Sequence, residues 1–173
     1  MAKAAKKTAP RKAGKAVSTP KAKPVRAARK HAAQAFTAKT AKEITATFCD
    51  RIGLTAKVAS AVAAEKVNIL AATGYSASGL RKNATFTLIV DDYAKAEKAL
   101  EKLGADDIHE SSIVMVETPN KPGALERIAG IIGDAGIDIY YFYATTSSGK
   151  TATSVFKTAD DKKAIRALRE ASS

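Results

Sequence analysis

The sequence predicts an α+β protein in which one βαββαβ unit occurs twice after a basic N-terminal segment. Three observations lead to this prediction. Residues 43–110 and 111–173 share the spacing of their apolar, glycine and polar positions. Within each copy, the hydrophobic pattern changes between the period of a strand and the period of a helix. Residues 1–42 contain ten lysines, three arginines and no acid, whereas the other 131 residues contain 16 basic and 17 acidic side chains.

The repeat is clearest in the turn and helix that follow the first strand of each copy. The segment 50–53 (Asp-Arg-Ile-Gly) returns seventy residues later as 120–123 (Asn-Lys-Pro-Gly). The apolar positions that follow then match without a gap: Val58 with Ile128, Val62 with Ile132, Val67 with Ile137 and Ile69 with Ile139. After a slip of two residues, Ala96, Ala99 and Leu100 match Ala164, Ala167 and Leu168. Equal spacing over this length means that one structural unit was used twice.

The basic segment, residues 1–42, consists mostly of Ala, Lys, Pro and Thr, with Phe36 as its one aromatic residue. Such a composition buries too little apolar surface to offset chain entropy, so we predict that this segment is disordered. Its charge of +13 resembles that of the Lys/Ala/Pro-rich tails of linker histones and favours contact with the phosphates of DNA or RNA. A solubilising or targeting extension is the alternative.

The elements of the first copy follow from periodicity and turn residues. Ile44, Ala46 and Phe48 alternate with threonines, which predicts a strand. The remaining predicted elements are a helix at 54–65, strands at 67–75 and 86–90, a helix that starts at Asp91–Asp92 and stops at Gly104, and a weak strand at 107–110.

The second copy repeats this order up to its last helix. We predict strands at 113–117, 137–145 and 153–158, and helices at 125–134 and 161–170, so this copy lacks a fourth strand of its own. The order β-α-β-β-α-β is that of the ferredoxin-like unit, in which two helices cover one face of an antiparallel sheet. One such unit is marginally stable alone, so we expect the two units to pack together and a homodimer to cover open sheet edges.

Polar residues recur with the repeat and suggest a duplicated ligand site. Gly53 and Gly123 let a ligand approach the backbone, and the helix that follows each glycine offers free N–H groups to a carboxylate. Each copy also pairs one carboxylate with one amide across the turn and the next strand: Asp50 with Asn68, and Asn120 with Asp138. This pattern suits a free amino acid. The alternative is purely structural, with caps and turn glycines and no ligand.

The motifs Asn120-Lys121-Pro122-Gly123-Ala124-Leu125 and Ala135-Gly136-Ile137-Asp138-Ile139 resemble those of the ACT domain, as do Asp50-Arg51-Ile52-Gly53-Leu54 and Val67-Asn68-Ile69. The resemblance covers residues 43–170 and implies modules that pair side by side and often bind amino acids between them. Carried over residue by residue, it implies ligand contacts from Asp50, Arg51, Ile52, Gly53, Leu54 and Asn68, and from Asn120, Lys121, Pro122, Gly123, Ala124, Leu125 and Asp138. The second copy is favoured, because Pro122 pre-orders its turn.

Other signals are weaker. Residues 144–151 fit a relaxed phosphate-loop pattern, but a strand rather than a helix is predicted after Lys150-Thr151. Cys49 has no histidine near it in sequence and is expected to be a small buried thiol, and the lone His109 is no metal site. In the aromatic run 140–143, Tyr141 and Tyr143 should share one face of a strand, as core or module interface.

Taken together, the sequence favours a cytoplasmic, non-enzymatic regulatory protein that binds a small amino acid between paired modules. The single cysteine fits a reducing compartment, no apolar run approaches about 18 residues, and no acid/base or nucleophile cluster recurs. We expect no cofactor and no metal. The competing hypothesis is a nucleoid-type protein whose basic segment binds nucleic acid and whose modules only oligomerise.

Overall fold

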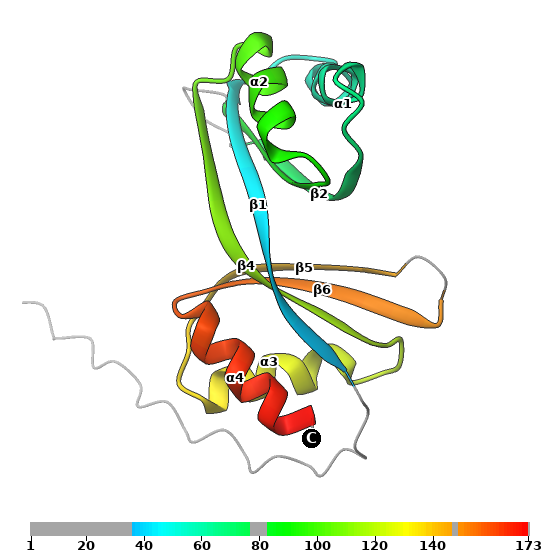
Figure 1. The fold of residues 1–173 in the computed structure, drawn as a ribbon, viewed down its shortest axis with the longest axis vertical. Helices are drawn as coiled ribbons and strands as arrows, with labels where there is room; N and C mark the ends of the chain where they lie inside the picture. The colour runs from blue at the N-terminus through cyan, green and yellow to red at the C-terminus, as the bar shows by residue number, and fades with distance from the viewer. Residues whose placement is uncertain (1–35, 77–82, 147–148, 173) are drawn as a thin grey trace, which may run out of the picture.

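The computed structural model describes residues 36–76, 83–146 and 149–172 and contains four helices and one antiparallel sheet (Figure 1). In chain order the elements are β1 (Thr37–Cys49), α1 (Leu54–Ala64), β2 (Ile69–Ser76), β3 (Asn83–Val90), α2 (Tyr93–Leu103), β4 (Asp107–Pro119), α3 (Ala124–Asp134), β5 (Ile139–Thr146), β6 (Thr151–Thr158) and α4 (Asp161–Ser172). The six strands lie in the order β2-β3-β1-β4-β6-β5. The predicted α+β class is confirmed.

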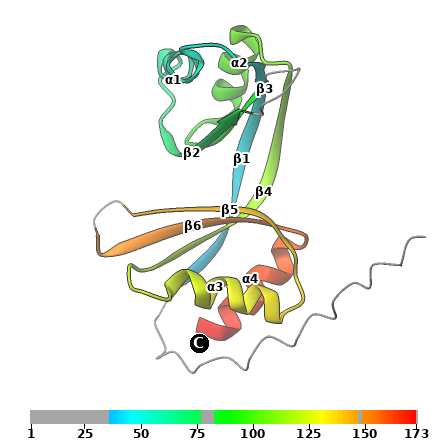
Figure 2. The same ribbon diagram turned by 180° about the vertical axis from the view of Figure 1, so that it is seen from behind.

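Two long strands connect the halves of the molecule. β1 and β4 each have 13 residues and pair antiparallel from Thr37 with Glu117 to Thr47 with Asp107. One end of this ribbon carries β2, β3, α1 and α2, here called the first lobe; the other carries β5, β6, α3 and α4, the second lobe (Figures 1 and 2). The strands predicted at 107–110 and 113–117 are therefore one continuous strand, and the strands of both copies form a single sheet.

The start of β1 corrects the predicted boundary of the basic segment. Residues 37–42, assigned to a disordered segment ending at residue 42, form the first half of β1, and Phe36 is only 7% exposed. No strand follows α4 in the described part of the chain; the first half of β1 lies beside β4 and takes the place of the strand that the second copy lacks. Composition alone missed this strand because β4 supplies its backbone partners and one aromatic residue anchors it. Residues 1–35 lie outside the described residues, so their predicted disorder stays a prediction.

Each lobe has its own hydrophobic core, and both cores lie on the same face of β1. Ile44, Ala46 and Phe48 pack in the first core, and Phe36 and Ala38 pack in the second. All are even-numbered residues of one extended segment, so their side chains point to one face, which the helices cover. Among the apolar positions that the repeat matched, the buried pairs are Val58/Ile128, Val62/Ile132, Val67/Ile137, Ala96/Ala164 and Leu100/Leu168. Ile69, Ile139 and Ala167 are half-buried.

The opposite, helix-free face holds the lobes together. Ile89, Ile113 and Val155 form a small buried cluster there, with contributions from strands of both lobes. In a flat sheet β1 and β5 would be about 14 Å apart, three strand spacings. However, Tyr141 and Tyr143 of β5 donate hydrogen bonds to Glu43 of β1, so the sheet folds over its helix-free face. This confirms the shared face predicted for the two tyrosines and their position at the module interface.

Candidate functional site

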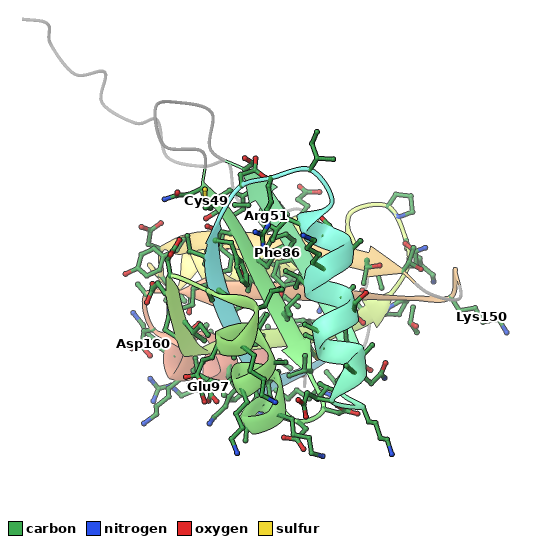
Figure 3. The ribbon with its side chains drawn as sticks, turned by 90° about the horizontal axis from the view of Figure 1, so that it is seen from above. Cys49, Arg51, Phe86, Glu97, Lys150 and Asp160 are labelled. Carbon is green, nitrogen blue, oxygen red and sulfur yellow. The ribbon has the colours of Figure 1, made fainter. Side chains whose placement is uncertain are left out.

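The turn after β1 forms one wall of a pocket in the first lobe. A cavity of about 340 Å³ lies between this turn, the start of α1 and the end of β2. Its lining residues are Asp50, Arg51, Gly53, Leu54, Thr55, Ala72, Thr73, Gly74, Tyr75, Ser76, Ala84 and Phe86. Seen from above, Arg51 and Phe86 lie beside α1, with Cys49 close by (Figure 3). Four of the five turn residues predicted for the first site therefore line one cavity.

The pocket opens onto the N-terminus of α1. Gly53 is the N-cap residue and has left-handed backbone angles, φ 82° and ψ 5°, which a residue without Cβ adopts at little cost. It offers no side-chain cap to the N–H groups of the first turn. Because these N–H groups carry the positive end of the helix dipole, they form a site suited to a carboxylate. Gly123 repeats this geometry at the start of α3, with φ 86°.

The carboxylate of Asp50 ties the turn to the end of β2. Ser76 Oγ donates a hydrogen bond of 2.5 Å to Asp50 Oδ2. A second oxygen on the same carboxylate is left for another donor. The first pocket thus combines helix N–H groups for a negative group with a fixed carboxylate for a positive one.

A second cavity, of about 460 Å³, lies at the equivalent place in the second lobe. It is lined by Thr118, Asn120, Lys121, Gly123, Ala124, Leu125, Glu126, Ala144, Thr145, Thr146, Ala152 and Ser154. Asn120 Nδ2 donates to the carbonyl of Gly149 at 3.2 Å and to Thr146 Oγ1 at 3.5 Å. Five of the six turn residues predicted for the second site therefore line its pocket.

The edge-strand walls of both pockets were missed by sequence reasoning. The walls 74–76 and 144–146 are seventy residues apart, the spacing of the repeat. Farther on, Phe86 and Ser154 correspond after the two-residue slip that also relates the second helices. The signal was therefore present in the repeat, for example in Ser76 and Thr146, but the prediction considered only the first turn and the start of the second strand of each copy.

Four of the predicted residues do not line either pocket. Ile52 is fully exposed at the turn, and Pro122 is exposed at the equivalent position. Asn68 and Asp138 precede β2 and β5, beyond the C-termini of α1 and α3. An eleven-residue helix is about 16 Å long, so within one chain Asn68 does not meet Asp50, nor Asp138 Asn120.

The backbones of Asn68 and Asp138 hold the starts of the edge strands. The N–H of Asn68 donates to Asp91 Oδ1 at 2.9 Å, and its carbonyl accepts from the N–H of Asp91 at 3.2 Å. In the second lobe, the carbonyl of Asp138 accepts from the N–H of Ala159 at 3.0 Å. The side chains of Asn68 and Asp138 are both exposed. Neither is held by another described residue, so both are accessible to a second molecule.

A buried carboxylate lies between the lobes and was not predicted. Glu43 is fully buried and accepts hydrogen bonds from Ser111 Oγ at 3.0 Å, from Tyr143 OH at 3.3 Å and from Tyr141 OH. Burial, reinforced by the Glu43 carboxylate, raises the pKa of both tyrosines. Glu43 was missed because the disordered basic segment was predicted to extend to residue 42. It is nevertheless the first acid in the chain and adjoins a predicted strand.

The described residues do not support a phosphate loop or a metal site, and they correct the prediction for Cys49. Cys49 is exposed, so its predicted burial is wrong: it is the last residue of β1, on the face opposite Phe48. Thr151 begins β6, which confirms that no helix follows the phosphate-loop-like segment. Among residues 36–76, 83–146 and 149–172, no cluster of His, Cys, Asp and Glu could hold a metal, and no helix is long and apolar enough to cross a membrane.

Solved structures with a similar fold include one bacterial protein without a functional name and several regulatory subunits. Protein BT0572 from Bacteroides thetaiotaomicron is 27% identical over 77% of this chain and 89% of its own, with a TM-score of 0.67. The ligand-free regulatory subunit of aspartate kinase from Thermus thermophilus is 18% identical over 82% of this chain and 99% of its own, with a TM-score of 0.57.

The regulatory subunit of aspartate kinase from Thermus flavus is likewise 18% identical over 82% of this chain and 99% of its own, with a TM-score of 0.56. No protein-family model and no curated protein matches the sequence. At these identities the likeness concerns the fold. The chain has the fold of the ACT-type regulatory domains of aspartate kinase, in agreement with the resemblance found in its motifs.

Proposed function

We propose that this protein is a non-enzymatic regulatory protein of the cytoplasm that binds a free amino acid where two copies of the chain pair. The observation that carries the proposal is the duplicated pocket at an uncapped helix N-terminus, each pocket opening beside an edge strand of the sheet. The regulatory subunits of aspartate kinase share this fold, which supports a regulatory role.

The two outer edges of the sheet support the pairing of two copies. Neither β2 nor β5 contains a charged residue or a proline, and each exposes large apolar side chains: Leu70 and Tyr75 on β2, Tyr140 and Phe142 on β5. Soluble proteins usually protect edge strands with charges. The first half of β1, which pairs with β4 on one side only, has Lys39 and Lys42, but β2 and β5 have no such protection. We therefore infer that both edges pair with a second copy.

Antiparallel pairing of like edges would complete the ligand site. The turn at Asp50 lies beside Ser76, at the end of β2, whereas Asn68 immediately precedes the start of β2. In an antiparallel pair of β2 strands, the start of one strand lies next to the end of the other. Asn68 of one copy would then approach the turn of its partner. The same geometry would bring Asp138 toward Asn120 across paired β5 strands.

The proposed ligand contacts follow from this arrangement. The ligand carboxylate binds the first-turn N–H groups next to Gly53, near the Arg51 side chain, and the ammonium binds Asp50 of one copy and Asn68 of the other. We favour the first pocket. Glu126 lines the second pocket in the first turn of α3, where its charge opposes a carboxylate, whereas α1 has no acid in its first turn. Pro122, the basis of the opposite prediction, is exposed and lines no pocket.

Thermal unfolding with each of the twenty amino acids tests the proposal, because a ligand of the folded state raises Tm. The best ligand is then titrated calorimetrically into Asp50→Asn, with Asp106→Asn, an exposed carboxylate outside both pockets, as the matched control. Loss of a charge-assisted hydrogen bond should weaken binding at least about tenfold in the first variant only. No Tm shift with any amino acid, or equal affinity in the two variants, would reject the site.

Edge pairing has its own test. Leu70 is 59% exposed, so Leu70→Lys should fold normally but place a charge on the pairing edge. We expect sedimentation velocity to show loss of the dimer and calorimetry to show loss of amino-acid binding. A variant that stays dimeric with unchanged affinity would show that β2 is not the pairing edge.

Nucleic-acid binding is a second candidate function, supported by the charge of the N-terminal segment. Residues 1–35, which precede the folded chain, contain eight lysines, three arginines and no acid. Such a segment should bind DNA or RNA without sequence preference and with a steep salt dependence. Since β1 begins at Thr37, the appropriate control is the full chain with these eleven cations changed to Gln, not a fragment that starts at residue 43. Equal binding by the two proteins at low salt would exclude this function.

A further inference from the structure

The exposed face of α4 is strongly basic. Ala164, Ile165 and Leu168 are buried in the core of the second lobe, whereas Lys162, Lys163, Arg166 and Arg169 are exposed. At about 100° per residue, Lys162, Arg166 and Arg169 lie in one row along the helix, with Lys163 to one side. Glu170, which follows Arg169, is the one exposed acid of α4. This face therefore presents a row of cations to solvent.

The equivalent helix of the first lobe is balanced in charge. On α2, Glu97 and Glu101 alternate with three lysines. Two of these lysines form ion pairs, Lys95 with Asp92 at 2.9 Å and Lys102 with Glu65 at 2.7 Å. Within the described part of the chain, no ion pair involves Lys162, Lys163 or Arg166. The basic face is therefore a feature of α4 and not of the repeated unit.

The described chain begins near the C-terminal end of α4. The Arg127 guanidinium lies 5.2 Å from the centre of the Phe36 ring, and its Nη2 donates to the carbonyl of Ala171 at 3.2 Å. Phe36, where the described chain begins, is thus one side chain away from the last turn of α4.

We propose that the α4 face is a contact surface for the phosphate backbone of a nucleic acid, in addition to the N-terminal segment. This inference rests on the second candidate function. From Lys162 to Arg169 the row is about 10 Å long, enough for about three phosphates of one strand. Arginine binds phosphate through two parallel hydrogen bonds, which adds to the charge attraction. A membrane surface fits less well, because α4 exposes no large apolar side chain that could enter the acyl region.

The test compares two full-length variants with the same change in charge. One is Lys162→Gln/Lys163→Gln/Arg166→Gln. The other is Lys57→Gln/Lys66→Gln/Lys98→Gln, which removes three exposed first-lobe lysines for which no ion pair with a described residue exists. Binding to a fluorescent 30-base-pair DNA duplex and to a single-stranded RNA of equal length is measured from 50 to 200 mM salt, and circular dichroism checks folding.

The α4 variant should bind the duplex at least about tenfold more weakly at 50 mM salt. The slope of log binding constant against log salt concentration should become less steep by up to about 2.7, which is 0.9 for each of three lost phosphate contacts. The first-lobe variant should change affinity less than about twofold. Equal losses in the two variants would overturn the α4 surface while leaving the N-terminal segment as a binder. If the unmodified chain binds neither nucleic acid at 50 mM salt, the second candidate function and this inference are both rejected. Both are also rejected if the chain binds phosphatidylserine vesicles but no nucleic acid.

Discussion

The two lobes have the same turn geometry, the same uncapped helix start and the same uncharged edge strand, but several side chains in and around their pockets differ. Asp50 of the first lobe corresponds to Asn120 in the second, Phe86 to Ser154, and Ala56 to Glu126. The first pocket is smaller and holds a carboxylate next to a helix start without acids, whereas the second is larger and has an acid in the first turn. Duplication preserved the backbone of the site and changed its charge.

The lobes also differ in how they are completed. The first lobe forms its fourth strand from the first half of β4, at its own C-terminal end. The second lobe uses the first half of β1, which precedes both copies in sequence. The second lobe therefore depends on the segment that connects it to the basic N-terminus, and the first does not. This difference predicts that the lobes respond differently to changes at Phe36.

The largest expected effect is a loss of stability in the second lobe when Phe36 is changed. Phe36→Ala removes a buried ring from its core and should lower the free energy of unfolding by about 3–5 kcal/mol. Amide exchange should become faster in α3 and α4 but change little in α1 and α2. Deletion of residues 1–35 is the control, since it leaves β1 intact, and should leave exchange in both lobes unchanged. Equal acceleration in the two lobes would mean that they unfold as one unit.

A smaller loss of stability is expected from changes at Glu43, where β1 and β5 of the two lobes are in contact. Glu43→Ala leaves the hydroxyls of Tyr141, Tyr143 and Ser111 without their acceptor and should cost about 2–3 kcal/mol in urea unfolding. Glu43→Gln keeps an oxygen acceptor and should cost less. If the two substitutions have the same cost, the packing of the side chain matters more than its hydrogen bonds.

Alkaline pH tests the same contact. The pKa of each tyrosine is raised in the folded protein, so only the unfolded chain loses these protons as pH passes about 10. Their stabilising contribution is complete below pH 10 and declines above it, as the unfolded chain releases protons that the folded chain keeps. Urea unfolding between pH 9 and pH 11 should therefore show a steeper loss in the unmodified protein than in Tyr141→Phe/Tyr143→Phe. Parallel curves would exclude these tyrosines as the cause.

The helices and most strands were predictable from sequence because each has a clear local period. α1, for example, was predicted to within one residue from Leu54, Val58 and Val62. The pocket turns were predictable because the repeat marks them twice. The first half of β1 was not, since its stability comes from pairing with β4, 70 to 80 residues away in sequence. Glu43 was missed for the same reason: a buried acid is recognised by its partners, and those partners lie on β4 and β5.

The smallest expected effect bears most directly on the comparison of the pockets. If Glu126 is what makes the second pocket less suited to a carboxylate, Glu126→Gln should tighten amino-acid binding there by removing a charge from the first turn of α3. An interaction of this kind with a helix terminus is worth about 0.3–1 kcal/mol, so the second Kd should fall about two- to fivefold. Titration calorimetry with the amino acid that gives the largest Tm shift measures both sites. Glu170→Gln, an exposed acid on α4, is the control and should change neither Kd. A second-site affinity that does not respond to Glu126→Gln would mean that other differences, such as Asp50 against Asn120 or Phe86 against Ser154, separate the two pockets.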